Sequence, residues 1–281
     1  MATYVHPEVL VETDWVKQNL GKPGIKIVEI DVDTKAYDAG HIAGAAGFNW
    51  QTQLQDQVSR DIISKEAFEK LIGGAGVSPS DIVILYGDNN NWFAAYGFWL
   101  FKLYGHKDVR LMNGGRVKWL NESDKELTTE VPRPKPVPYK VTAVHEELRA
   151  LLPDVSQAVR ARSHNLVDVR SPDEFTGKVI APPGMTETAQ RGGHIPGAKS
   201  IPWSTAVNQD GTFKSADELR TIYFKQNGVD SAKETIAYCR IGERSSHTWF
   251  VLKYLLGLDK VKNYDGSWTE YGNLIRVPIE K

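Results

Sequence analysis

The chain has 281 residues, of which 41% are hydrophobic and 25% are charged, and its net charge is −1. This composition is typical of an ordinary globular protein, and the length predicts about two domains. The balanced charge gives no reason to expect nucleic acid or an anionic membrane surface as a partner. Any anion that the protein binds must therefore be recognised by local charge.

Cys239 is the only cysteine. A single cysteine excludes an internal disulfide, and the sequence contains no Cys-x-x-Cys pair or Cys/His cluster of the kind that binds a metal. We therefore expect no metal and no cofactor. The N-terminal residues lack a basic region followed by an apolar core, and no apolar run is long enough to span a membrane. These features predict a cytoplasmic protein in a reducing setting, without a membrane anchor.

The first half of the chain alternates helices and strands. Thr13 is expected to cap a short helix that ends near Gly21. The elements predicted after it are a strand over 25–30, a helix over 65–72, a strand over 82–86, a long helix over 93–103 and a short strand over 109–111.

Alternating prolines over 131–138 predict an extended, semi-rigid connector. A ligand for the groove of another protein is the alternative interpretation of this segment. The elements predicted beyond it are a helix over 145–161, a strand over 166–169, a helix over 216–225, a strand that ends at Tyr238, and a helix over 245–256. Short apolar strands separated by helices predict an α/β fold, with a parallel sheet flanked by helices on both faces in each half.

The second half repeats the first at a nearly constant offset. Tyr86 matches Tyr238 at a distance of 152 residues, and His41 matches His194 at a distance of 153. Self-similarity of this kind indicates two homologous domains. We place the N-terminal domain at residues 1–125, a proline-rich linker at 126–144 and the C-terminal domain at 145–281.

The two halves differ where chemistry is expected. The second half carries 16 additional residues within a Gly- and Pro-rich segment over 176–193, which predicts a loop. At the position of Cys239 the first half has Gly87, and at the position of Arg244 it has Trp92. Because it lacks both a nucleophile and a guanidinium, we expect the N-terminal domain to be catalytically inactive.

Cys239 directly follows an apolar strand and precedes a loop with two arginines, Arg240 and Arg244. In parallel sheets, ligands bind beyond the carboxyl ends of the strands. Guanidinium groups, loop N–H groups and a helix N-terminus all stabilise an anion. In such surroundings a thiol pKa falls to roughly 3.5–7.5, so we expect a thiolate at neutral pH.

Three segments resemble the rhodanese sulfurtransferases: the Cys-Arg-Ile-Gly-Glu-Arg-Ser loop at 239–245, the Gly-His-Ile-Pro-Gly-Ala segment at 193–198, and the segment at 261–271. Their order and spacing are those of the family, and the resemblance covers nearly the whole chain. It extends to the tandem arrangement of two rhodanese-like domains with an inactive first domain. The amino-acid sequence of this loop is most similar to that of the actinobacterial thiosulfate sulfurtransferases.

The resemblance implies a thiosulfate:cyanide sulfurtransferase. Cys239 would take the outer sulfur of thiosulfate, release sulfite, and pass the sulfur from a persulfide to cyanide or a thiol. The partners would be a small anionic donor and one of these acceptors, an acceptor protein being unidentified. Ile241, Gly242, Glu243 and Ser245 complete the active-site loop, whose N–H groups and hydroxyl can donate to the persulfide.

Four arginines are candidate substrate ligands: Arg240, Arg244, Arg191 and Arg170. A guanidinium binds sulfonate oxygens in a forked arrangement that an ammonium group cannot reproduce. Animal members of the family carry a further arginine in the region that matches residues 172–175, which has none here. Arg191 or Arg244 must replace it if a clamp exists.

Asp168 is expected to form a structural salt bridge or hydrogen bond, and His194 to hold a loop by hydrogen bonding rather than to act as a base. Tyr264 and Trp268 are expected to pack in the interior or at the rim of the site.

Three other functions compete with this interpretation. A 3-mercaptopyruvate sulfurtransferase would carry small neutral residues after its cysteine, whereas this chain carries Arg240. Cysteine phosphatases share the strand, loop and helix arrangement, but they separate cysteine and arginine by one residue more than Cys239 and Arg244 are separated. A persulfide carrier or regulatory binding domain is the third alternative, and the intact cysteine and arginines disfavour pure binding.

Overall fold

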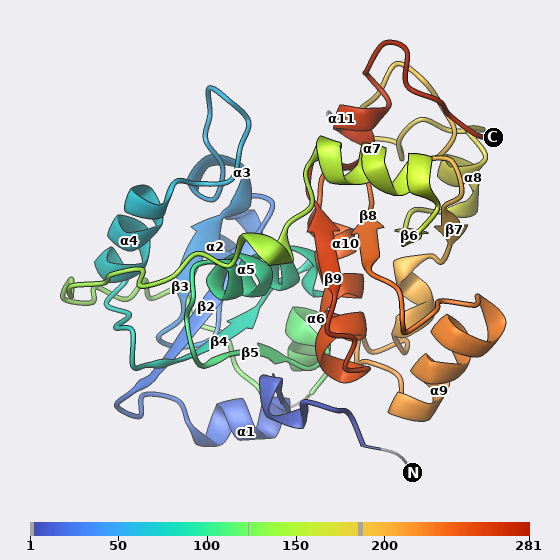
Figure 1. Ribbon diagram of the computed structural model, residues 1–281. Helices are drawn as coiled ribbons and strands as arrows, with labels where there is room; N and C mark the ends of the chain where they lie inside the picture. The colour runs from blue at the N-terminus through green and yellow to red at the C-terminus, as the bar shows by residue number, and fades with distance from the viewer. Residues whose placement is uncertain (1–2, 123, 185–187) are drawn as a thin grey trace. The chain divides into compact units, whose positions relative to one another are not determined.

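The computed structural model describes residues 3–122, 124–184 and 188–281 (Figure 1). The chain divides into two compact units. The N-terminal unit comprises Glu8–His145 and Gln209–Phe213, and the C-terminal unit comprises Met1–Pro7, Glu146–Asn208 and Lys214–Lys281. No helix within the described ranges is both long enough and apolar enough to cross a membrane.

The N-terminal unit contains a five-stranded parallel sheet in the order β1-β5-β4-β2-β3. Its strands are β1 (Leu10–Val11), β2 (Ile25–Asp31), β3 (Ala46–Asn49), β4 (Ile82–Tyr86) and β5 (Val109–Met112). Its helices are α1 (Thr13–Gln18), α2 (Lys35–Ala39), α3 (Trp50–Gln53), α4 (Lys65–Gly74), the 3-10 turn η2 (Asn89–Asn91), α5 (Trp92–Leu103) and α6 (Gly115–Asn121).

Both faces of this sheet are covered, as the sequence predicts. On one face Ile84 and Tyr86 of β4 pack with Val16 of α1 and Trp119 of α6. On the other face α5 contacts β2, β4 and β5. Gly97 lets α5 approach the sheet closely, because a Cβ at this position would lie 2.2 Å from Ile30 Cδ1. The continuous apolar runs of β2 and β4 follow from burial on both sides.

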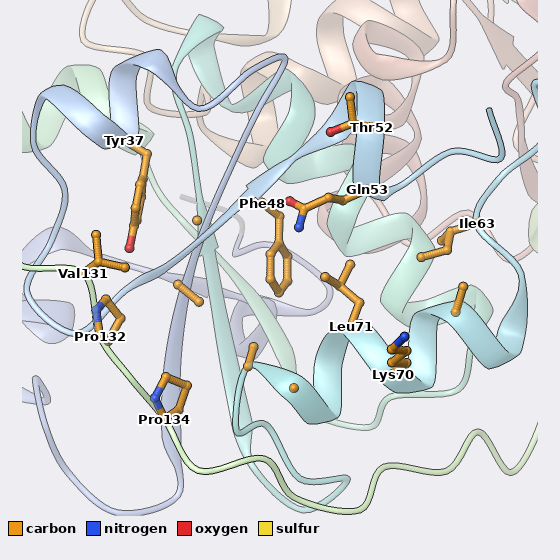
Figure 2. Close-up of a pocket in the computed structure, with 15 residues that line it drawn as sticks. Tyr37, Phe48, Thr52, Gln53, Ile63, Lys70, Leu71, Val131, Pro132 and Pro134 are labelled. Atoms are coloured by element: carbon orange, nitrogen blue, oxygen red, sulfur yellow. The ribbon is translucent and has the colours of Figure 1, made fainter.

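A groove of about 730 Å³ opens beside the edge strand β3, between α4 and the proline-rich segment (Figure 2). Phe48 of β3 and Leu71 of α4 lie on its apolar surface, and Val131 and Pro132 line the opposite side. None of the residues that line this groove is a predicted site residue. The connector also runs beside α4, where Val137 N–H donates to Gly73 C=O at 3.0 Å.

The C-terminal unit contains a four-stranded parallel sheet in the order β7-β6-β8-β9. Its strands are β6 (Asn165–Asp168), β7 (Lys199–Ser200), β8 (Thr235–Tyr238) and β9 (Val261–Tyr264). Its α-helices are α7 (Leu152–Ala161), α8 (Pro172–Phe175), α9 (Ala216–Arg220), α10 (Glu243–Phe250) and α11 (Ser267–Tyr271). Short 3-10 turns lie at Glu146–Leu148 (η3) and Trp203–Ala206 (η4), and π-helical turns extend α9 over Thr221–Gln226 (η5) and α10 over Val251–Leu255 (η6).

The two faces of this second sheet are also covered. Ile236 and Tyr238 of β8 pack with Val155 of α7 and Trp268 of α11. Helix α10 contacts β8 and β9 and is buried along its whole length. The parallel α/β architecture with helices on both faces is therefore confirmed in both units.

Several element boundaries differ from the sequence prediction. Thr13 is the first residue of α1 and does not cap it, because Glu12 occupies the cap position. The helix predicted over 145–161 is interrupted, since Ala150 N–H donates to Asn263 C=O at 2.9 Å and draws the chain alongside β9. The helix predicted from Ser245 begins two residues earlier, at Glu243.

The long segment predicted as a loop over 176–193 contains no helix or strand in its described part. Residues 185–187 of this prediction lie outside the described residues.

Candidate active site

Cys239 follows β8 directly and is completely buried. Its backbone is held by α11, the helix that follows β9. Cys239 N–H donates to Ser267 Oγ at 3.0 Å, and Trp268 N–H donates to Cys239 C=O at 3.1 Å. Thr269 N–H similarly donates to Arg240 C=O at 3.0 Å. The end of the strand is therefore fixed before the loop turns into α10.

Three groups from the loop surround the Cys239 sulfur. Gly242 N–H donates to Sγ at 3.1 Å, and the Ser245 hydroxyl lies 3.6 Å from it. The thiol in turn donates to Glu243 Oε2 at 3.2 Å. Gly242, Glu243 and Ser245 therefore contact the sulfur. Ile241 of the same loop is buried, with an exposure of 3%.

The loop has its shape because Gly242 adopts a φ of +101°, in the region that favours glycine. A Cβ at Gly242 would lie 2.9 Å from Asp265 Cα, so a side chain does not fit there. Gly242 C=O accepts from Ser246 Oγ at 2.7 Å and from Asn263 Nδ2 at 3.3 Å. These contacts hold Gly242 N–H in the direction of the sulfur.

Arg244 lies in the first turn of α10 and is only 3% exposed. Its two terminal nitrogens donate to the carboxylate oxygens of Glu174 at 2.9 and 3.0 Å. Burial alone would raise the pKa of Glu174, but Arg244, together with Ser171 N–H and Arg170, outweighs burial and holds the pKa below its usual range. This buried ion pair positions Arg244 from a second element, α8.

Glu174 is the residue that the sequence analysis missed. A signal for it is present, because Ser171 and Glu174 form the Ser-x-x-Glu pattern of a helix capping box. In the structure Glu174 accepts from Ser171 N–H at 3.0 Å and from Arg244 at the same time. The segment 172–175, which lacks an arginine, thus provides the partner of an arginine.

The expected thiolate is wrong for this arrangement. Burial raises the pKa of the Cys239 thiol above its usual range, and the Glu243 carboxylate raises it further. Arg244 offsets these two effects only in part. The loop is less cationic than its sequence indicates, because Glu174 and Glu243 both face Arg244. Burial and the Glu243 carboxylate thus favour the protonated form of the thiol, contrary to the expected thiolate.

Arg240 belongs to the same loop and is 5% exposed. Arg240 is thus the second buried arginine, besides Arg244, in the loop that follows the thiol. Its role as a substrate ligand stays a prediction.

Arg170 has no exposed surface. Its Nη2 lies 2.6 Å from Asp168 Oδ2 and 2.7 Å from Gly193 C=O, and its guanidinium carbon lies 4.5 Å from the centre of the Trp268 ring. The structural salt bridge expected of Asp168 is thus confirmed, as is the interior packing of Trp268. Substrate contact by Arg170 stays a prediction, and its internal contacts weigh against it.

Arg191 links the inserted loop to the C-terminal segment. Its guanidinium donates to the carbonyls of Gly272, Tyr271, Leu274 and Val277 at distances of 2.5–3.3 Å. A substrate would have to replace these bonds, so Arg191 as an outer clamp also stays a prediction. His194 Nδ1–H donates to Phe175 C=O at 2.9 Å, which confirms that it holds a loop.

The corresponding position of the N-terminal unit has no room for a side chain. A Cβ at Gly87 would lie 2.3 Å from Ile30 C=O. Asn91 fills the loop, since its Oδ1 accepts from Gly87 N–H at 3.0 Å and its Nδ2 donates to Met112 C=O at 2.8 Å. Trp92, which replaces arginine, begins α5.

A family model described as "Rhodanese-like domain" matches this chain twice, at residues 12–122 and 145–274. A protein of Haloferax volcanii named "Putative thiosulfate sulfurtransferase" is 55% identical over 98% of this chain and 96% of its own length. A protein of the same name from Saccharopolyspora erythraea is 57% identical over 97% of this chain and 96% of its own length. The sulfur carrier protein TtuD of Thermus thermophilus is 55% identical over 99% of this chain and 98% of its own length.

Among solved structures, the chain is similar to SseA from Escherichia coli, described with the rhodanese fold and the mechanism of 3-mercaptopyruvate sulfotransferases. The TM-score is 0.80 and the identity 26%, over 92% of this chain and 98% of SseA. The structure of YnjE shares the fold with a TM-score of 0.86, covering 100% of this chain and 70% of that protein.

Proposed function

The chain belongs to the rhodanese family of sulfurtransferases, and we propose that it is a thiosulfate sulfurtransferase that works through a persulfide on Cys239. The observation that carries this proposal is the surrounding of one sulfur atom. Sγ accepts from Gly242 N–H at 3.1 Å, next to the buried Arg244 at the beginning of α10. Positive charge and N–H groups at a helix N-terminus stabilise an anionic sulfur.

The reaction has two halves. In the first, the ionised sulfur of Cys239 attacks the outer sulfur of thiosulfate, a new S–S bond forms, and the old S–S bond breaks with its electron pair leaving on sulfite. In the second, cyanide or a thiolate attacks the terminal sulfur of the persulfide, and Cys239 leaves as a thiolate. We propose that Gly242 N–H and the Ser245 hydroxyl, which lie 3.1 and 3.6 Å from Cys239 Sγ, donate to the terminal sulfur between the two half-reactions.

Arg240 and Arg244 are the proposed ligands of the donor anion. In the free protein both terminal nitrogens of Arg244 donate to Glu174, so a donor anion that binds Arg244 would have to replace these hydrogen bonds, as it would at Arg191. Arg240 is a second buried guanidinium in this loop, and positive charge at this position would reduce the repulsion between two anions. The proposed localisation is cytoplasmic, since a free thiol persists in a reducing compartment.

We propose that the N-terminal domain is catalytically silent, because no side chain fits at Gly87. The proposed domain limits are 1–125 and 145–281, with the linker at 126–144 between them.

The first experiment is thiocyanate formation from thiosulfate and cyanide, together with the intact mass after treatment with thiosulfate alone. We expect one added sulfur atom in the wild type, which can be assigned directly because Cys239 is the only cysteine. Cys239→Ser should lose turnover by a factor of about 10³ or more, since it removes the nucleophile. Turnover that survives this substitution contradicts the assignment.

A donor comparison separates the alternatives. The relative named as a sulfur carrier supports a protein thiol as acceptor, and the likeness to SseA makes 3-mercaptopyruvate the donor to compare. A higher kcat/KM with 3-mercaptopyruvate than with thiosulfate would replace the proposed donor. Hydrolysis of an aryl phosphate without any sulfur transfer would replace the reaction class.

A further inference from the structure

The carboxylate of Glu243 lies in an unexpected place for a sulfurtransferase loop. Its Oε2 is 3.2 Å from Cys239 Sγ, and the thiol is the donor of that hydrogen bond. Glu243 is only 1% exposed, so water does not screen it. A fixed negative charge at this distance would oppose both the formation of a thiolate and the approach of a dianion. The position therefore calls for a chemical reason.

The other charged groups around this pair come from several elements. Arg244 of α10 lies 3.5 Å from Glu243 Oε1 through its Nε, and Glu174 of α8 pairs with the far side of that guanidinium. Arg240 precedes Glu243 in the same loop. Asp265, after β9, lies against Gly242 and is itself paired with Arg149 at 2.8 Å. Glu243 is the carboxylate among these that contacts the sulfur.

We propose that Glu243 is a catalytic residue that takes the proton of the Cys239 thiol as sulfur transfer begins and returns it when the thiolate is released. The inference rests on the proposed sulfurtransferase function and deepens it. The S–H bond breaks, the proton moves to Glu243 Oε2, and the electron pair that remains on sulfur attacks the outer sulfur of the donor. Sulfite leaves with the electron pair of the broken S–S bond.

The proton transfer also changes where the negative charge lies. Before transfer, the charge of the pair is on the carboxylate, and after transfer it is on the sulfur that attacks. Glu243 is then neutral and no longer opposes the incoming anion, and Arg244 is released from one of its two carboxylate neighbours. In the second half-reaction the Cys239 thiolate takes the proton back, so the cycle needs no additional acid or base.

The test is single-turnover sulfur uptake from thiosulfate over a range of pH, with Glu243→Gln compared with the wild type. We expect the variant to be slower by roughly 10²-fold at neutral pH, as is typical for removal of a general base. The deficit should disappear at high pH, where the thiol ionises without help. Alkylation of Cys239, measured at each pH, should show a lower thiol pKa in the variant because a negative neighbour has been removed.

A purely electrostatic or structural role of Glu243 would not produce slow sulfur uptake at neutral pH together with recovery at high pH and a lower thiol pKa. If Glu243 only repels anions, Glu243→Gln takes up sulfur as fast as the wild type or faster, and the proposal is overturned. If the variant is equally slow at every pH, Glu243 is structural and the proposal is also overturned. Glu243→Asp retains a carboxylate and should recover part of the rate. Glu66→Gln, at a carboxylate of α4 whose side chain is exposed, is the matched control and should leave the rate unchanged.

Two further measurements keep the outcomes separate. Wild-type protein that gains no sulfur from thiosulfate or 3-mercaptopyruvate at any pH removes the proposed function itself, independently of Glu243. If Glu243→Gln does not fold, infrared difference spectra of the wild type decide instead. Loss of the S–H band on formation of the persulfide should be accompanied by a new protonated-carboxyl band, and its absence overturns the proposal.

Discussion

The Cys239 loop and the Gly87 loop occupy the same place in two similar sheets, and they show what the fold supplies without chemistry. Each loop follows a tyrosine at the end of a strand. The Tyr86 hydroxyl accepts from Ile42 N–H at 2.9 Å, and the Tyr238 hydroxyl accepts from Ile195 N–H at 3.1 Å. The frame that carries the loop is thus kept in both units, whether or not a nucleophile is present.

The loops themselves are built in opposite ways. Around Cys239, Gly242 N–H donates to the sulfur of the side chain, and the Ser245 hydroxyl lies 3.6 Å from that sulfur. Around Gly87, the side chain of Asn91 takes the hydrogen bonds, and three consecutive asparagines adopt positive φ values of 46°, 54° and 63°. The second loop is filled by its own side chains, so it has lost the space for a reacting group.

The charges near the two loops differ as well. Arg244 is held between two carboxylates in the C-terminal unit. In the N-terminal unit, burial and the nearby Asp88 and Glu29 together raise the pKa of Asp31 to about 9. The Gly87 loop also has no guanidinium to attract an anion, because Trp92 stands at the position of Arg244. The comparison teaches that the frame of the fold is kept in both units, while the filling of the loop and the charges around it differ.

Among the substitutions that test this comparison, Arg244→Lys is expected to have the largest effect. Lysine retains the positive charge but cannot form the forked hydrogen bonds that we propose for the donor anion. One charge-assisted hydrogen bond contributes about 1.5–3 kcal/mol, so kcat/KM for thiosulfate should fall roughly 10- to 100-fold. Steady-state kinetics measure it, with circular dichroism to verify folding. An unchanged kcat/KM would show that charge alone at this position is sufficient.

A smaller effect, on stability alone, is expected from Gly87→Ala. The added Cβ would lie 2.3 Å from Ile30 C=O, and overpacking of this kind costs about 1–3 kcal/mol of unfolding free energy. Denaturant unfolding measures it. Gly74→Ala in α4 is the matched control, since nothing lies within 4 Å of its Cβ position, and it should be neutral or slightly stabilising. Equal effects of the two substitutions would contradict the close packing at Gly87.

The smallest effect is expected from Asp31→Asn. Because the folded-state pKa of Asp31 is raised to about 9, the protonated carboxyl favours folding below the unfolded pKa, and this contribution is lost as pH rises toward 9. An asparagine imitates the protonated form at every pH. The variant should therefore be more stable than the wild type by about 1 kcal/mol at pH 8, in line with the cost of a poorly paired buried polar group.

The measurement is the unfolding free energy at several pH values, together with sulfurtransferase activity. The stability advantage should shrink as the pH falls toward 4, and activity should not change. A loss of stability at pH 8 would show that the Asp31 carboxylate is ionised and well paired.

Sequence periodicity and self-similarity predicted most of the fold. The strands 82–86 and 235–238 and the long helix near 93–103 are where the apolar runs indicate, because burial on both faces leaves an unambiguous pattern. The predicted helix over 145–161 failed because a long-range contact of Ala150 with Asn263 competes with the local preference. Local patterns do not encode such a contact.

For the candidate site, the sequence by itself predicted the nucleophile, the loop and the inactive repeat, because each prediction depends on neighbouring residues and their spacing. Only the tertiary structure decided the charge state of that loop. Glu174 is 70 positions from Arg244 in the sequence and pairs with its guanidinium, and burial of Cys239 raises the pKa of its thiol beside Glu243. Desolvation and ion pairing depend on what surrounds a group in space, and here those surroundings come from separate strands and helices.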